Sequence, residues 1–311
     1  MQATWMPWAN KVKAFDPEYD GLFDNLVVPT AETVRQSFMI DIHAKFKKGV
    51  MMIGIAGTGK TTVVKDYFSA VNQETTATAT INFNSFTDSK ALQTVLVGEM
   101  APRTGIILGP PPGKQLIFFM DDLNMPKVDV YGTQSPICLI RQIIDYSLIF
   151  NREHLEEKKK LIDVMFLACM NPKSGSFHVD TRMSRHFTLI ALVVPEKEIL
   201  LTIYKQIFEA HLSTFDGPCQ KVGPQIVNAT AVVFASLANS PQFMPTAMKF
   251  HYQFNLRDFA KIIQNLTLAQ ASTYKGNALG LVRMWAHECH RVWQDRLLFD
   301  IDREAYMNFM R

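Results

Sequence analysis

The order of apolar and polar residues divides the chain into two parts. Up to about Pro195, short apolar runs with the length of buried strands alternate with stretches that suit helices. Strands that alternate with helices are typical of a parallel sheet. The pattern therefore predicts a five-stranded parallel α/β sheet flanked by helices, with strands at residues 51–53, 80–83, 116–120, 164–170 and 187–194.

After Pro195 the strand signals stop and helical spacing takes over. Apolar residues recur three and four positions apart, which places them on one face of a helix. We therefore predict a large α/β nucleotide-binding subdomain over residues 1–195 and a small helical lid over residues 196–311, with a hinge at residues 193–197. The apolar positions of the lid are Leu200, Ile203, Tyr204, Ile207 and Phe208, followed by Leu256, Phe259, Ala260 and Ile263.

A phosphate-binding loop follows the first predicted strand. Residues 54–61 read Gly-Ile-Ala-Gly-Thr-Gly-Lys-Thr and stand between an apolar run and a helix-forming stretch, which is the context that this motif requires. The glycines let backbone N–H groups surround an anion, and the amino end of the next helix adds positive potential. Lys60 is expected to reach the β- and γ-phosphates of a nucleoside triphosphate, and the Thr61 hydroxyl to bind Mg²⁺. The predicted nucleotide-binding residues are Gly54, Gly57, Thr58, Gly59, Lys60, Thr61 and Thr62.

A second signal of a nucleotide site ends the third predicted strand. Residues 116–120 form a buried-strand run that closes with Asp121 and Asp122, the arrangement of a Walker B strand. Asp121 is expected to hold Mg²⁺ directly or through water, and Asp122 to polarise the attacking water. The acid at the second position is more often Glu, and Asp is one methylene shorter. The motif therefore predicts nucleotide binding and leaves turnover open.

Polar residues near the last two predicted strands have two interpretations each. Asn171 follows the fourth strand, where its amide would lie near the γ-phosphate and the water, although Asn171-Pro172 also forms an ordinary turn. Arg182 and Arg185 lie one helical turn apart just before the last strand. They are candidates for a role at a nucleotide, and they are equally well explained as surface arginines near a loop.

The start of one lid helix carries another candidate. Asn255 is expected to cap the helix and Asp258 suits its first turn. Arg257 between them would face the phosphates and sense the bound nucleotide if the lid folds over the sheet. The alternative is a surface arginine paired with neighbours of Asp258.

Composition narrows the function classes. The chain has 311 residues, of which 48% are hydrophobic and 20% charged, and its net charge of +3 is too small and scattered to indicate nucleic-acid binding. The run 158–160 of three lysines follows three glutamates and is interpreted as a solvated face or loop. With no apolar stretch of the ~20 residues that span a bilayer and no signal-peptide pattern, we expect an intracellular protein without membrane contact. Its four cysteines lack paired spacing, which favours reduced thiols.

Taken together, the motifs resemble the third AAA+ module of a dynein heavy chain, most of all in axonemal heavy chains of the outer-arm type. The resemblance covers nearly the whole chain and implies an AAA+ P-loop NTPase fold with a C-terminal helical lid. The segments that carry it are residues 54–61, 119–126 (Phe-Met-Asp-Asp-Leu-Asn-Met-Pro), 131–134 (Tyr-Gly-Thr-Gln), 168–172 (Ala-Cys-Met-Asn-Pro), 182–187 (Arg-Met-Ser-Arg-His-Phe) and 254–258 (Phe-Asn-Leu-Arg-Asp).

The resemblance also implies roles for single residues. It implies ATP or ADP with Mg²⁺ as cofactors and a site completed by residues outside the phosphate loop. Asn171 would be the first sensor of the nucleotide and Arg257 the second. Arg182 or Arg185 would be an arginine finger that contacts the nucleotide of the preceding module. The segment 28–30, with Pro29 and Thr30, would pack on adenine.

The resemblance also implies which proteins the chain contacts and where in the cell the complete motor acts. The direct partners would be neighbouring AAA+ modules of the same heavy chain. Intermediate and light chains and microtubules would be reached through the full motor, in the cytoplasm, on the cytoskeleton of the ciliary or flagellar axoneme. In this family the first module drives the power stroke and the third is a regulatory site, and Asp in place of the catalytic Glu is common in axonemal third modules.

Three functions remain open at this point. The first is a regulatory ATP-binding module with slow hydrolysis in an axonemal dynein. The second is a structural module that holds nucleotide permanently to stiffen the ring. The third is an independent AAA+ ATPase that assembles into its own ring, in which Arg182 or Arg185 would serve a neighbouring copy.

Overall fold

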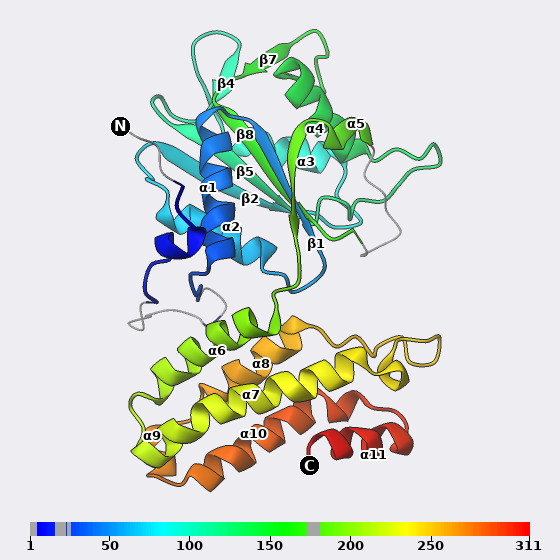
Figure 1. The fold of residues 1–311 in the computed structure, drawn as a ribbon. Coiled ribbons are helices and arrows are strands. Elements are labelled where there is room, and N and C mark those ends of the chain that lie inside the picture. Colours follow the sequence, from blue (N-terminus) through cyan, green and yellow to red (C-terminus); the bar gives the residue numbers. More distant parts are fainter. Residues whose placement is uncertain (1–4, 16–22, 24–25, 173–180) are drawn as a thin grey trace. The chain divides into compact units, whose positions relative to one another are not determined.

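The chain folds into two compact units. The structure, a computed structural model, describes residues 5–15, 23, 26–172 and 181–311. One unit is formed by Glu32–Val194, and the other by Pro195–Arg311 together with Met1–Ala31. The first 31 residues, which we assigned to the large subdomain, thus group with the helical unit, and the division at residue 195 into two functional subdomains stays a prediction. Each unit is described below by itself (Figure 1).

A five-stranded sheet forms the centre of the first unit. Its strand order is β2-β5-β8-β1-β9, and every neighbouring pair is parallel. The predicted five-stranded parallel α/β sheet is confirmed, and each predicted run contributes one strand. The strands are β1 (Gly49–Gly54), β2 (Thr76–Asn82), β5 (Gln115–Asp121), β8 (Val164–Met170) and β9 (Phe187–Leu192).

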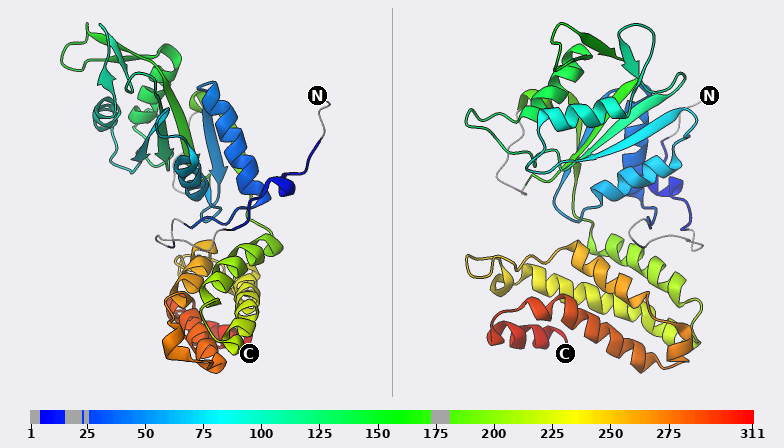
Figure 2. Two further views of the ribbon diagram at one scale, coloured as in Figure 1. Left: turned by 90° about the vertical axis from the view of Figure 1, so that its left-hand side faces the viewer. Right: turned by 180° about the vertical axis from the view of Figure 1, so that it is seen from behind.

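Side chains alternate between the two faces of this sheet, as the pleat requires. Along β1, Val50 and Met52 lie in one core with Ile40 and Val64, whereas Met51 lies in the core of the opposite face. Both faces are covered, which explains why the three central strands β1, β5 and β8 are almost entirely apolar and buried. Figures 1 and 2 show α1 (Ala31–Lys45) and α2 (Lys60–Ala70) on one face and α3 (Ser89–Gly98) and α4 (Ser135–Tyr146) on the other.

A second, smaller sheet was not predicted. Its order is β3-β4-β7-β6, and its strands are only two to four residues long, too short for a clear alternation of apolar and polar residues. The lysine run 158–160 lies in β7 and is exposed, so its solvated face is confirmed and its interpretation as a loop is wrong. The strands are β3 (Ala101–Pro102), β4 (Ile107–Gly109), β6 (Leu148–Phe150) and β7 (Lys158–Leu161); the short helix α5 (Thr181–Ser184) precedes β9.

The second unit is helical. The predicted apolar stripes are buried or half-buried, with Phe208, Phe259 and Ile263 completely inaccessible. Within the described residues no helix is both long enough and apolar enough to cross a membrane. The helices are η1 (Trp8–Lys11), α6 (Lys197–Leu212), α7 (Gly217–Asn239), η3 (Pro241–Phe243), α8 (Leu256–Leu266), α9 (Ala271–Tyr274), α10 (Ala278–Val292), η4 (Gln294–Arg296) and α11 (Asp300–Phe309).

A buried carboxylate joins α11 to the rest of this unit. Asp302 has no exposed surface. Its Oδ1 accepts a hydrogen bond from Gln242 Nε2 at 2.9 Å, and its Oδ2 accepts one from the Tyr252 hydroxyl at 3.0 Å. The Lys249 ammonium lies 2.7 Å from Oδ2 and forms an ion pair with it. Three side chains of this unit thus satisfy the carboxylate inside the fold.

Candidate nucleotide-binding site

The phosphate loop connects the end of β1 to the start of α2. Gly54 closes the strand and Gly59 caps the helix with a φ of 81°. Gly57 has a φ of 85°, so both inner glycines adopt the left-handed backbone that other residues rarely reach. A Cβ on Gly54 would lie 2.8 Å from Leu192 O and from Thr58 Oγ1, which leaves no room for a side chain. The sequence of the loop and its backbone shape therefore agree.

Lys60 is held against the loop that it follows. Its ammonium donates to the carbonyl oxygens of Gly54 at 2.8 Å and Ile55 at 2.9 Å, and the residue is 9% exposed. Ile55 O also accepts a hydrogen bond from the Thr58 hydroxyl at 2.9 Å. The ammonium thus lies inside the curve of the loop, where it can be transferred from backbone carbonyls to phosphate oxygens at little conformational cost.

The two predicted Mg²⁺ ligands meet across the sheet edge. The Thr61 hydroxyl donates to Asp121 Oδ2 at 2.9 Å, although the residues are 60 positions apart in the chain. Asp121 Oδ1 accepts the backbone N–H of Asp122 at 3.1 Å. A hydroxyl oxygen and a carboxylate oxygen side by side are the kind of oxygen ligands that Mg²⁺ prefers. The donor set of the site therefore fits a nucleoside triphosphate with its Mg²⁺.

Asp122 lies in the turn that ends β5. It is exposed and has a φ of 53°, a left-handed conformation that is uncommon for a residue with a side chain. The next residue, Leu123, donates its N–H to Cys169 O at 3.1 Å and is fully buried. The chain therefore turns sharply at Asp122 and is held again immediately after it, which presents the carboxylate at the carboxyl end of the sheet.

A buried thiol lies beneath these acidic residues. Cys169 of β8 is completely inaccessible, and all four cysteines are free thiols, which confirms that prediction. Burial raises the pKa of the Cys169 thiol, and the negative charge of Asp121 raises it further. The thiol is therefore protonated and inert at neutral pH. The hydrogen bond that Cys169 O accepts from Leu123 and the pairing of Cys169 with Met52 of β1 place the end of β8 beside the ends of β5 and β1.

Asn171 lies one residue beyond β8, as predicted for a sensor. Its carbonyl oxygen accepts a hydrogen bond from Asn124 Nδ2 at 2.9 Å. Asn124 is 2% exposed, and no role for it was predicted from the sequence. The only signal available was its place two residues after the paired aspartates. Asn171 follows β8 at the carboxyl end of the sheet, the same end as Asp121, and a contact of its side chain with a γ-phosphate stays a prediction.

Of the two candidate finger arginines, Arg182 lies in the short helix α5 and Arg185 directly follows it. Arg182 and Arg185 are both exposed. Arg185 Nη2 lies 3.6 Å from Asp145 Oδ1 of α4, and His186 Nε2 lies 3.3 Å from the same oxygen. A distance of 3.6 Å at an exposed ion pair corresponds to a weak interaction. The arginine is thus oriented within its own unit and remains accessible from outside.

The remaining predicted site residues belong to the other unit. Arg257 is exposed in the first turn of α8, where the predicted cap is present: Asn255 accepts the N–H of Arg257 at 2.9 Å, and Asp258 accepts that of Asn255 at 3.1 Å. Pro29 and Thr30 directly precede α1 and are half-buried. The contacts of these three residues with a nucleotide stay predictions.

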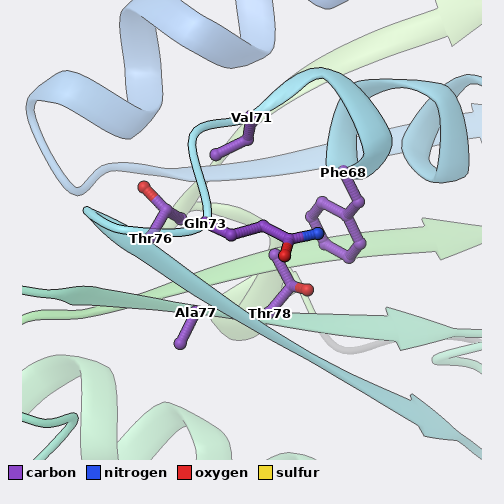
Figure 3. A pocket seen from close by; sticks show the side chains of 6 residues that line it. All are labelled: Phe68, Val71, Gln73, Thr76, Ala77 and Thr78. Carbon is purple, nitrogen blue, oxygen red and sulfur yellow. The ribbon is translucent and has the colours of Figure 1, made fainter.

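Two pockets of the described structure lie away from the phosphate loop. One, of about 210 Å³, lies between the end of α2 and the start of β2, at the opposite end of that strand from the site (Figure 3). The other, of about 280 Å³, lies at the amino ends of β1 and β8 and includes Gly49 and Val164. Neither pocket includes a residue of the phosphate loop. The assignment of the candidate site is therefore based on the backbone shape of the loop and on the groups that could bind phosphate and Mg²⁺. The first pocket is lined by Phe68, Val71, Gln73, Thr76, Ala77 and Thr78.

Comparison with known proteins supports the phosphate loop and the helical lid independently of the geometry. Residues 15–195 match the family described as the P-loop containing dynein motor region, and residues 227–310 match the AAA+ lid domain. The chain is 38% identical over 304 residues to the dynein beta chain of the flagellar outer arm of Chlamydomonas reinhardtii, and 38% identical over 303 residues to human dynein axonemal heavy chain 17. A ciliary dynein beta chain of Heliocidaris crassispina is also 38% identical.

These alignments cover unequal shares of the proteins compared. They include 97% to 98% of this chain but only 6% to 7% of each relative. The chain thus corresponds to a small part of a much longer type of protein.

Proposed function

The chain belongs to the dynein motor family of P-loop proteins, whose fold implies nucleotide binding, and on this premise we propose that it is a regulatory ATP-binding module of an axonemal dynein heavy chain. The observation that carries the proposal is the meeting of the Thr61 hydroxyl with Asp121 at 2.9 Å beside the buried ammonium of Lys60. Two motifs that are distant in sequence thereby form one binding site for phosphate and metal.

The names of the relatives support the place of action. They are described as flagellar outer-arm, ciliary and axonemal dynein chains. The module would therefore act on the cytoskeleton of a cilium or flagellum. Its direct partners would be the neighbouring AAA+ modules of its heavy chain, and it would reach intermediate chains, light chains and microtubules only through the complete motor.

Each residue of the site has a chemical role in this proposal. Lys60 binds the β- and γ-phosphates, and Thr61 and Asp121 hold Mg²⁺, which neutralises phosphate charge when it is bound. Asp122 accepts the proton of the attacking water, and the Asn171 amide orients the water and the γ-phosphate. The backbone of residues 54–59 supplies N–H donors to the phosphates, with Thr62 in the first turn of α2 beside them.

The length of the acid favours a regulatory site over a fast one. Asp122 carries its carboxylate one methylene closer to the backbone than Glu would, and a displacement of about 1 Å can cost roughly 100-fold in rate. A slowly hydrolysing site holds each nucleotide state for longer. That property suits a module that controls its neighbours, because the state must persist while they act.

The outer residues extend the site beyond one module. We assign Arg182 or Arg185 as the finger offered to the nucleotide of the preceding module, since both are exposed on α5 or just after it. Arg257 would act as the second sensor and Pro29 with Thr30 would contact adenine. These assignments require adjacent AAA+ modules in a ring.

Loss of the phosphate contact is the first test of the binding site. Lys60→Ala should weaken ATP binding on the order of 100-fold, which corresponds to about 2.7 kcal/mol, because a charged hydrogen-bond donor to phosphate is removed. Isothermal titration calorimetry with Mg-ATP measures this loss. Lys65→Ala is the matched control, since Lys65 is exposed on the same helix. Equal affinity of parent and Lys60→Ala would contradict the placement of the site.

Single-turnover hydrolysis of Mg-ATP over a range of protein concentrations tests the regulatory role. Slow turnover with exchangeable nucleotide, slowed further by Asp122→Asn, is expected. Brisk turnover that rises with protein concentration would indicate the self-assembling ATPase instead. Nucleotide that survives purification and does not exchange would indicate a structural module.

A further inference from the structure

The segment that follows β5 is joined to the end of β8 by two hydrogen bonds. Regular pairing of the strands ends at Met120 and Ala168. Beyond that point the Leu123 N–H donates to Cys169 O at 3.1 Å, and Asn124 Nδ2 donates to Asn171 O at 2.9 Å. The connection between these two segments therefore continues past the paired part of β5 and β8, from the residues that follow the predicted acid Asp122 to the predicted sensor Asn171.

Asn124 is built into the fold at this junction. Its side chain is 2% exposed, and a buried amide must be hydrogen-bonded to avoid a large desolvation cost. The same segment is anchored on its far side by Gln134, which is 5% exposed and donates its Nε2 to Pro126 O at 2.7 Å. The loop is thus held at both ends, and the Asn124 side chain connects it to Asn171, the residue that follows β8.

The backbone turn at Asp122 is held in place by the hydrogen bonds of the residues that follow it. A left-handed φ of 53° is unfavourable for aspartate and persists only where its surroundings hold it. Met125 N–H donates to Asp122 O at 3.0 Å, and the bonds of Leu123 to Cys169 and of Asn124 to Asn171 fix the chain immediately after the turn.

We propose that Asn124 is a positioning residue of the nucleotide site: its amide holds Asn171 and the Asp122 turn in one fixed arrangement, so that the acid and the sensor respond to the γ-phosphate together. This inference rests on the proposed function, because it assumes that Asn171 and Asp122 face a bound nucleotide. It assigns to Asn124 an indirect role, without contact to the nucleotide itself.

The test compares nucleotides that differ at the γ-phosphate. The dissociation constants of ATPγS and ADP are measured for the parent chain, Asn124→Ala, Asn171→Ala and the double variant. The preference for ATPγS over ADP should fall about fivefold or more in each single variant. The double variant should lose no more than Asn171→Ala alone, because residues that act through one another are not additive. Asn151→Ala is the control, since Asn151 donates to Glu157 in the β6–β7 hairpin.

A second variant separates positioning from folding. Asn124→Asp keeps the shape of the side chain but removes the amide donor, so it should reproduce the lost preference without leaving a cavity. An unchanged preference in Asn124→Asp, or additive losses in the double variant, would overturn the inference while the parent still binds nucleotide. A parent chain that binds neither nucleotide would overturn the proposed function and this inference with it.

Discussion

Asp121 and Asp302 show how one type of side chain serves two purposes in the two units. Asp302 is fully buried and accepts hydrogen bonds from Gln242 and Tyr252 while it pairs with Lys249 at 2.7 Å. Asp121 is half-buried at the end of β5 and accepts hydrogen bonds from the Thr61 hydroxyl and from the backbone of Asp122. The charge of the first carboxylate is balanced by a lysine of its own chain, whereas the hydrogen bonds described for the second come from uncharged groups.

The difference teaches how a binding carboxylate can be distinguished from a structural one. A buried carboxylate that has its own ammonium partner is costly to remove, because the ammonium is left in the fold without a counter-charge. A carboxylate that lies beside a hydroxyl at a phosphate loop can accept an external cation without displacing a lysine. The partner set, more than the burial of the acid, indicates the role of each aspartate.

The largest expected effect is on the structural carboxylate. Asp302→Ala should lower the free energy of unfolding of the helical unit by about 3–5 kcal/mol, because it leaves the Lys249 ammonium without its buried partner. Urea unfolding followed by tryptophan fluorescence measures this, since Trp285 and Trp293 lie in that unit. Asp300→Ala, at a position whose side chain is 91% exposed in the same helix, is the control and should change stability by less than about 0.5 kcal/mol.

A smaller effect should distinguish the binding carboxylate. Asp121→Asn should leave the unfolding free energy nearly unchanged and weaken ATP binding on the order of 10-fold when Mg²⁺ is present. Without Mg²⁺, parent and variant should bind ATP about equally, because the charge of Asp121 then has no metal to hold. Calorimetric titrations with and without Mg²⁺ provide the measurement. A loss of affinity of the same size in both conditions would count against a metal-binding role.

The smallest effect concerns acid stability. Burial acts to raise the pKa of Asp302, but the hydrogen bonds from Lys249, Gln242 and Tyr252 outweigh it and leave the pKa below its usual value. Asp302 therefore stabilises the folded state above the unfolded pKa of about 3.9, and this contribution is lost as the pH falls through the lower folded pKa.

Asp302→Asn should remove that contribution. Its unfolding free energy should depend less steeply on pH than that of the parent below about pH 4, as measured by urea unfolding across the acid range. Asp163 of the other unit also contributes to the pH dependence of unfolding, in the parent and the variant alike, because the hydrogen bond from Lys47 lowers its pKa. Identical pH profiles for the parent and the variant would show that Asp302 carries no such contribution.

Local patterns predicted much of the fold and the centre of the site. The five strands, the phosphate loop and the cap of α8 depend on neighbouring residues, so they could be read from spacing and residue type. The second sheet could not, because strands of two to four residues have too short a pattern. Asn124 also escaped notice, since its partner Asn171 is 47 positions away and no local feature marks the bond.

The sequence by itself determined the class of the protein: apolar runs set the strands, glycines allowed the left-handed turns of the loop, and Lys60, Thr61 and Asp121 supplied the chemistry. Only the tertiary structure decided the strand order β2-β5-β8-β1-β9, and with it the meeting of Thr61 with Asp121 and of Asn124 with Asn171. The physical reason is that residue type and spacing act within a few positions of the chain. Which strands become neighbours depends on burying the whole apolar surface at once.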